Sequence, residues 1–180
     1  MNPIKKKILK AAAIMAGFLV AMAALRVWYL DEQGNFLSIT PGEAYRSAQL
    51  DQDELVHYIG KYQIRSVINL RGENDAERWY TVETAMCRNL GVRHYDLGLT
   101  AYAMPTALEI RELLRLFSIA PRPVLIHCKA GADRSGLAAA IWKMTIDGSP
   151  KSVAMKQLSL RFGHMPFGST HVMDTFIEKW

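Results

Sequence analysis

The sequence has few residues that could stabilise a fold through disulfide bonds or bound metal ions. Only two cysteines, Cys87 and Cys128, occur in 180 residues, which excludes a disulfide framework as the source of stability. Four of the five histidines show no ligand spacing with cysteines or carboxylates, so we assign no metal and no cofactor; they are His57, His94, His164 and His171. Internal repeats and low-complexity linkers are lacking too. We therefore expect one well-buried domain with a short appendage.

Acidic residues are absent from the first 26 positions. That stretch holds Lys5, Lys6, Lys7, Lys10 and Arg26, which account for the whole formal net charge of +5. Residues 27–180 therefore carry no net charge. The basic balance is a targeting feature, and we expect no nucleic-acid partner.

Charged and strongly polar side chains are also absent between Ala11 and Leu25. A run of this length after a basic start suits a signal-peptide core better than a membrane span of about 20 residues. Residues 21–23 place small side chains at the spacing that signal peptidase favours. Arg26 follows closely and is unfavourable for cleavage, so an uncleaved N-terminal anchor is the alternative. We expect residues 1–30 to be a signal peptide or N-terminal anchor and residues 31–180 to be exported, to the periplasm, with no other membrane contact.

Residues 127–136, His-Cys-Lys-Ala-Gly-Ala-Asp-Arg-Ser-Gly, carry the chemistry. An apolar run, residues 123–126, precedes them and a helical pattern, residues 137–142, follows, which predicts strand, turn and helix. Such a loop points backbone N–H groups at one spot in front of a helix N-terminus and forms an anion cradle. Gly131 permits the tight curl, and Arg134 adds a two-pronged donor suited to phosphate oxygens. We expect phosphate to bind at Lys129, Ala130, Gly131, Ala132, Asp133, Arg134 and Ser135.

Cys128 lies at the floor of this cradle. Helix N-termini and nearby cations lower the pKa of a thiol from about 8.5 to roughly 3.5–7.5, so such a cysteine becomes a nucleophile. We expect Cys128 to attack phosphorus while Arg134 and the loop amides hold the phosphate oxygens. Water then hydrolyses the cysteinyl-phosphate, and no metal is needed.

The spacing of His-Cys, five residues and Arg-Ser resembles the signature of the cysteine-dependent protein tyrosine phosphatase superfamily. Residues 45–49, Tyr-Arg-Ser-Ala-Gln, and residues 69–71, Asn-Leu-Arg, are similar to segments of the bacterial, plant and fungal atypical dual-specificity phosphatases. The resemblance covers roughly residues 40–150. A rhodanese loop is one residue shorter, and a Walker-type loop has no cysteine nucleophile.

This resemblance implies roles for further residues of the loop. His127 would hold the cysteine region through hydrogen bonds, and Ser135 would donate to the thiolate. Lys129 and Asp133 would either tune the shape of the loop or contact substrate. From the sequence itself, Arg46 is a surface or structural residue and Cys87 a small core residue on a helix.

Hydrophobic periodicity predicts strands that alternate with helices. Strands are expected at 66–70, 92–99 and 123–127, and amphipathic helices at 52–62, from the Asn74 cap to Gly91, and along 110–117. Asp51 with Glu54, and Asn74 with Glu77, are expected to cap the first two helices, and the second should turn Val82, Met86 and Leu90 inward. The expected fold class is α/β, with a central, mainly parallel sheet of four to five strands and helices on both faces.

The general acid is the least defined part of the site. Asp96 lies 32 residues before Cys128, similar to the separation in dual-specificity phosphatases, and we expect it to protonate the leaving oxygen. Against this, residues 95–97 have the pattern of a strand interior, and the loop at 100–105 has no carboxylate. Glu73 or Asp75 on the neighbouring loop is the alternative.

We therefore expect a phosphatase that hydrolyses phosphotyrosine, or phosphoserine and phosphothreonine as well. An enzyme for inositol phosphates or other small phosphate esters is the first alternative, and an inactive phosphate-binding module is the second. Intact Cys128 and Arg134 oppose the inactive module. A near-neutral domain opposes highly charged inositol polyphosphates, which call for more lysines around the cradle.

Overall fold

A computed structural model describes residues 2–180, with the backbone alone described at Arg26, Val27 and residues 29–32. The chain divides into two compact units, Met1–Gln33 and Gly34–Trp180. The side chain of Arg26, on which the cleavage argument depended, lies outside the described residues.

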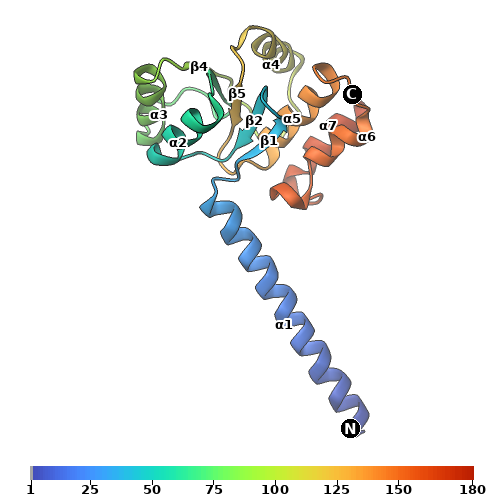
Figure 1. Ribbon diagram of the computed structural model, residues 1–180. Helices are drawn as coiled ribbons and strands as arrows, with labels where there is room; N and C mark the ends of the chain where they lie inside the picture. The colour runs from blue at the N-terminus through green and yellow to red at the C-terminus, as the bar shows by residue number, and fades with distance from the viewer. Residues whose placement is uncertain (1) are drawn as a thin grey trace. The chain divides into compact units, whose positions relative to one another are not determined.

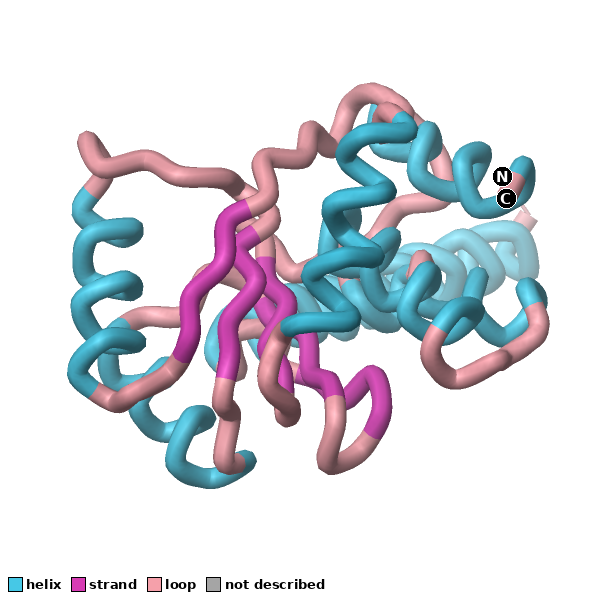
Figure 2. The backbone as a smooth tube through the Cα atoms, turned by 90° about the horizontal axis from the view of Figure 1, so that it is seen from above, coloured by secondary structure: helices cyan, strands magenta, loops and turns pink. Residues whose placement is uncertain are grey.

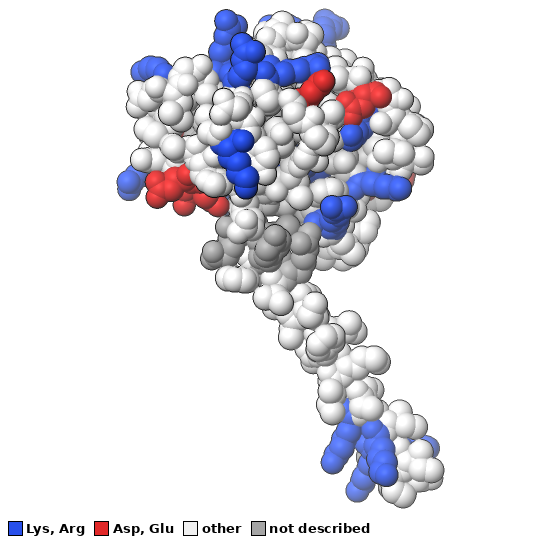
Figure 3. All heavy atoms as spheres, in the orientation of Figure 1, with Lys and Arg blue, Asp and Glu red and all other residues white. Residues whose placement is uncertain are grey.

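The first unit is a single helix, α1, Pro3–Glu32. Lysines gather at its free end and apolar side chains follow, as Figure 3 shows. The 23 residues Pro3–Leu25 are long and apolar enough to cross a membrane. At 1.5 Å per residue they span roughly 35 Å, more than the hydrocarbon core of about 30 Å. A signal sequence has the same length and composition, so both interpretations of the segment stand.

The second unit is built on a five-stranded sheet (Figure 1). The strands are β1 Leu37–Thr40, β2 Ala44–Ser47, β3 Ser66–Asn69, β4 Arg93–Asp96 and β5 Val124–His127. Their order is β1-β2-β5-β3-β4, and all neighbours are parallel except the β1–β2 pair. The expected mainly parallel sheet is confirmed, and its carboxyl ends meet at one edge, where ligands bind in such folds.

Helices cover both faces of the sheet, as Figure 2 shows. One face carries α2 Gln52–Tyr62 and α3 Arg78–Asn89. The other carries α4 Ala107–Ile119, α5 Asp133–Thr145, α6 Lys151–Ala154 and α7 Val172–Lys179. The short 3₁₀ helices η1 Met155–Gln157, η2 Leu160–Phe162 and η3 Ser169–His171 join α6 to α7.

The cap predictions had different outcomes. Asp51 and Glu54 form the expected capping box of α2. The cap from Asn74 is wrong, because α3 begins after Glu77, which makes no side-chain cap bond. The inward face of α3 is corrected in part: Met86 packs against the core as expected, but Leu90 is exposed, and Tyr80, Glu83 and Cys87 are the buried residues. A buried glutamate carries no hydrophobic signal, so the pattern selected a neighbouring stripe of the helix.

Strand alternation assigns the side chains of β5 to two cores. Val124 and Ile126 pack with α4 and α5, whereas Leu125 packs with α2 and α3. Because successive side chains of a strand point to opposite faces, His127 faces α3 and Cys128, the next residue, belongs to the α5 side. His127, the last residue of the strand, and Cys128 are thus held by different layers.

The larger core predicts a steep cost for removing one aromatic ring. Phe117 of α4 is 1% exposed, and its ring meets that of Trp142 edge-on at 5.0 Å. We expect Phe117→Ala to lower the free energy of unfolding by about 3–5 kcal/mol, because it leaves a cavity. Leu108→Ala, on the same helix but 70% exposed, should cost less than about 0.5 kcal/mol. Urea unfolding of the full chain in mild detergent measures both, and similar costs for the two would contradict this core.

Candidate active site

The loop at residues 128–132 links β5 to α5, so Cys128 leaves a buried strand and Arg134 is the second residue of a helix. Gly131 has φ +68°, and a Cβ there would approach the backbone N of Ala48 to 2.5 Å. Only glycine fits this position without displacing the β2 backbone. The expected strand, turn and helix around the loop are confirmed.

Arg46 of β2 holds this loop from below. Its side chain is fully buried and donates from Nη2 to the carbonyl oxygens of Gly131 and Ala132, at 2.8 and 2.9 Å. Nη1 donates to the Gln157 carbonyl at 2.8 Å and to its side chain at 3.2 Å. Burial lowers the pKa of Arg46 to about 10, although the charges of Cys128 and Asp133 act to raise it. The guanidinium therefore stays cationic at neutral pH. Of the two expected roles, the structural one is correct.

A pocket of about 340 Å³ opens above the loop. Residues 99–102 line one wall, and Cys128, Lys129, Ala130, Asp133 and Arg134 line the rest. Cys128 is only 2% exposed and lies at the bottom. Arg134 donates from Nη1 to the carbonyl oxygens of Leu70 and Leu99, at 3.3 and 3.2 Å. Its buried Nε has no hydrogen-bond partner among the described residues, which leaves a donor for an anion.

The other residues of the loop divide between surface and interior. Lys129 and Ala130 are exposed at the pocket, whereas Gly131, Ala132 and Ser135 are buried. The Ser135 hydroxyl donates to the Ser47 carbonyl oxygen at 3.4 Å rather than to the Cys128 sulfur. The helix cap is Ala132, so Ser135 is the third residue of α5 and not its N-cap.

His127 belongs to a buried network that sequence reasoning missed. Its Nε2 lies 3.1 Å from Glu83 Oε1, and the same oxygen lies 2.8 Å from His94 Nε2. Burial would raise the pKa of Glu83, but the charges and hydrogen bonds of His127 and His94 outweigh it and hold that pKa far below its ordinary value. Burial likewise opposes the charge on His94, yet Asp96 and Glu83 raise its pKa to about 9. The network anchors the end of β5, directly before Cys128.

Arg71 adds a second guanidinium near the loop. It lies over the Trp79 ring, 3.4 Å from the centroid, and donates to Gln49 Oε1 at 3.0 Å. Gln49 in turn donates to Glu83 Oε2 at 2.6 Å. Burial and the nearby positive charge of Arg134 lower the pKa of Arg71. Two neighbouring guanidiniums favour an anion at this edge of the sheet.

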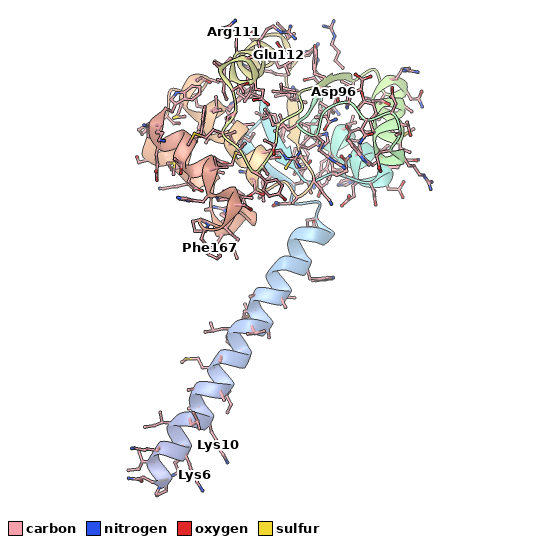
Figure 4. The ribbon with its side chains drawn as sticks, turned by 180° about the vertical axis from the view of Figure 1, so that it is seen from behind. Lys6, Lys10, Asp96, Arg111, Glu112 and Phe167 are labelled. Atoms are coloured by element: carbon pink, nitrogen blue, oxygen red, sulfur yellow. The ribbon has the colours of Figure 1, made fainter. Side chains whose placement is uncertain are left out.

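Asp96, labelled in Figure 4, is not among the residues that line the pocket above Cys128. It is the last residue of β4 and pairs in register with Asn69, which pairs with His127. All three therefore project towards α3, and Asp96 accepts from Asn69 Nδ2 and Tyr80 Oη, both at 2.8 Å. Burial would raise its pKa, but hydrogen bonds from His94, Tyr80 and Asn69 hold it below its ordinary value.

These contacts oppose the expected role of Asp96, because a carboxylate stabilised in its ionised form is a poor proton donor. Its assignment as the general acid therefore stays a prediction. The strand expected at 92–99 is also corrected, since β4 ends at Asp96 and not at Leu99. Glu73 and Asp75 are exposed on the loop after β3, and neither lines the pocket above Cys128.

A second depression, of about 350 Å³, lies at the amino ends of the strands. Arg65 and Arg93 are its only charged lining residues, and its lining includes no cysteine, histidine or carboxylate. It has no group for nucleophilic or acid–base chemistry. The pocket above Cys128, where a buried thiol lies beside a guanidinium, is the candidate active site.

Known structures share this architecture. The crystal structure of P. aeruginosa TpbA superposes with a TM-score of 0.66 at 24% identity, covering 81% of this chain and 84% of that one. The catalytic core of the PP-IP phosphatase SIW14 from S. cerevisiae gives a TM-score of 0.66 at 20% identity, covering 81% and 85%. At these identities the likeness establishes the fold.

Sequence comparisons carry the assignment further. The dual specificity protein phosphatase TpbA of Pseudomonas aeruginosa is 29% identical over 131 residues, which are 72% of this chain. The chain spans 55% of the length of that relative. A model of the family described as "Tyrosine phosphatase family" matches residues 31–156, which include β1 to β5 and the whole loop at 128–132. The chain therefore belongs to the tyrosine phosphatase family.

Proposed function

We propose that the protein is a phosphatase that hydrolyses phosphotyrosine, or phosphoserine and phosphothreonine as well, through a cysteinyl-phosphate intermediate. The observation that carries this proposal is the placement of Cys128 at the bottom of a pocket beside Arg134, whose buried Nε is left without a partner among the described residues. A nucleophile and an unpaired anion donor at one point fit phosphoryl transfer.

The proposed reaction has two steps. The Cys128 thiolate attacks phosphorus, the bond from phosphorus to the ester oxygen breaks, and that oxygen takes up a proton as it leaves. Arg134 and the loop N–H groups hold the three non-bridging oxygens. A water molecule then attacks the cysteinyl-phosphate, which releases inorganic phosphate and returns the thiolate.

Two observations favour an aryl phosphate as substrate. The relative named above is a dual specificity protein phosphatase, and its structure was also solved in complex with phosphotyrosine. In this chain Tyr102, 71% exposed, stands on the wall of the pocket, where its ring can stack on that of a phosphotyrosine.

A small, highly phosphorylated ester is the second candidate. The observation that favours it is the similarity to a PP-IP phosphatase fold, together with Arg71 beside the loop. Lys129 is the single lysine among the lining residues, which gives the pocket little positive charge beyond Arg134. Phosphotyrosine therefore remains the favoured substrate.

We also propose that the domain acts outside the cytoplasmic membrane, in the periplasm, with α1 as a signal peptide or as an anchor. The supporting observation is the order of a lysine-bearing start and a long apolar stretch within α1. Lysines stay on the cytoplasmic side of a membrane, so the domain after α1 would lie on the other side.

The nucleophile is tested with the two cysteines as a matched pair. We expect Cys128→Ser to abolish turnover of p-nitrophenyl phosphate and phosphotyrosine peptides, because a serine hydroxyl is not ionised at neutral pH. Cys87→Ala should retain turnover within about threefold, since Cys87 is buried in α3. Turnover of the wild-type chain should persist in excess chelator. Activity that a chelator removes and a divalent ion restores would contradict this mechanism.

The general acid is tested with leaving groups of different basicity. The contacts of Asp96 lead us to expect that Asp96→Asn changes turnover of phosphoserine and of p-nitrophenyl phosphate by similar, small factors. A general acid contributes about 10²–10⁴-fold, and chiefly to poor leaving groups. A loss of that size confined to phosphoserine would establish Asp96 as the acid despite its position.

The topology is tested by fusing a reporter enzyme after Gln33, the boundary between the two units. We expect a reporter that folds only outside the cytoplasm to be active, and replacing Lys5, Lys6, Lys7 and Lys10 with glutamate to reduce that activity. A fusion active only with a cytoplasmic reporter would refute export.

A further inference from the structure

A buried histidine joins the phosphate loop to the C-terminal helix. His164 is 0% exposed, and its Nδ1 lies 2.7 Å from Asp133 Oδ1. Its Nε2 lies 2.7 Å from Asp174 Oδ2. Asp133 directly precedes Arg134 and lines the pocket, so the chain Asp133–His164–Asp174 runs from the candidate active site into the α5–α7 layer.

Both ring nitrogens of His164 face a carboxylate oxygen. A neutral imidazole has one N–H and would turn a lone pair towards one of these carboxylates, whereas the imidazolium donates to both. Burial opposes the charge, but the hydrogen bonds and charges of Asp133 and Asp174 outweigh it and raise the pKa of His164. His171 also faces Asp174, with its Nδ1 3.4 Å from Oδ2, and Arg46 acts on Asp133 from β2.

Asp133 is otherwise out of place in an anion-binding loop. A free carboxylate one residue from Arg134 would repel an incoming phosphate and compete for the guanidinium. The bond to a protonated His164 offsets the charge of that carboxylate and holds Oδ1 against the imidazole. Two hydrogen bonds between uncharged groups connect the same loop to η2: Asn35 Nδ2 donates to the carbonyl oxygens of Ala130 and Phe162, both at 3.0 Å.

We propose that His164 is a positioning residue of the phosphatase: its imidazolium, fixed by Asp174, neutralises and orients Asp133 so that the loop accepts a phosphate dianion. The proposal rests on the proposed function for its effect on turnover. Its effect on phosphate binding can be measured without turnover.

The first test uses His164→Gln in the full chain, with His171→Gln as the matched control on the exposed side of Asp174. Phosphate affinity is measured as the concentration of inorganic phosphate that protects Cys128 from iodoacetamide, with the alkylated peptide quantified by mass spectrometry. We expect His164→Gln to weaken protection about tenfold and to lower kcat about 10- to 100-fold, since a small misplacement of reacting groups costs up to about 100-fold. His171→Gln should change neither by more than about twofold.

The second test separates charge from shape. If the unpaired carboxylate is what repels phosphate, adding Asp133→Asn to His164→Gln should restore most of the lost protection. A merely structural role predicts that the double variant is no better than the single one, and that result would overturn the proposal. Unchanged protection and kcat in a folded His164→Gln protein would also overturn it.

The third test follows pH. His164 is expected to be protonated up to its raised pKa, so phosphate protection in the wild-type chain should fall as the pH rises through that value. Asp174→Asn removes one cause of the raised pKa, so the fall should move to lower pH. A wild-type and variant profile that coincide would refute the proposal, even if His164→Gln does not fold. If the wild-type chain shows no turnover but phosphate protection changes as expected in the variants, the proposed function is refuted and the role of His164 in phosphate binding stands.

Discussion

The candidate active site depends on one buried guanidinium. Arg46 is fully buried, and four hydrogen bonds satisfy its two terminal nitrogens, two of them to the carbonyl oxygens of Gly131 and Ala132. A planar peptide points its N–H opposite to its C=O, so carbonyls turned towards Arg46 turn the following N–H groups towards the pocket. The cradle is therefore a consequence of what lies beneath it. Gly131, packed against the β2 backbone, allows the approach that these bonds require.

The two layers of helices hold the loop from opposite sides. The α5 side supplies Arg46, His164 and Asp174, and the α3 side supplies Glu83, which binds His127. The α3 side holds His127 at the end of β5, whereas the α5 side holds Gly131, Ala132 and Asp133 further along the loop and at the start of α5. Cys128, the proposed nucleophile, lies between them, directly after a strand whose residues are all buried.

The parts of the site that a local pattern encodes could be predicted from the sequence. The apolar strand, Gly131 and the start of α5 follow from neighbouring residues, and they place Cys128 and Arg134 in the pocket. Asp96 was assigned by its distance along the chain from Cys128, but the side of the sheet that it faces depends on register with Asn69 and His127. Glu83 and His164 were not found, because each joins separate elements of the fold through side-chain contacts and a buried polar residue has no hydrophobic signal. Periodicity describes one element at a time, and these contacts join several.

The central claim is that a phosphate becomes covalently attached to Cys128 during turnover. Rapid acid quenching of the full chain with an aryl phosphate, followed by digestion and mass spectrometry, tests it most directly. The account predicts a transient phosphate on the peptide that contains Cys128, formed before inorganic phosphate accumulates. A phosphate on any other residue, or steady turnover with no phosphorylated peptide at any quench time while a known cysteinyl-phosphate survives the same procedure, would contradict it.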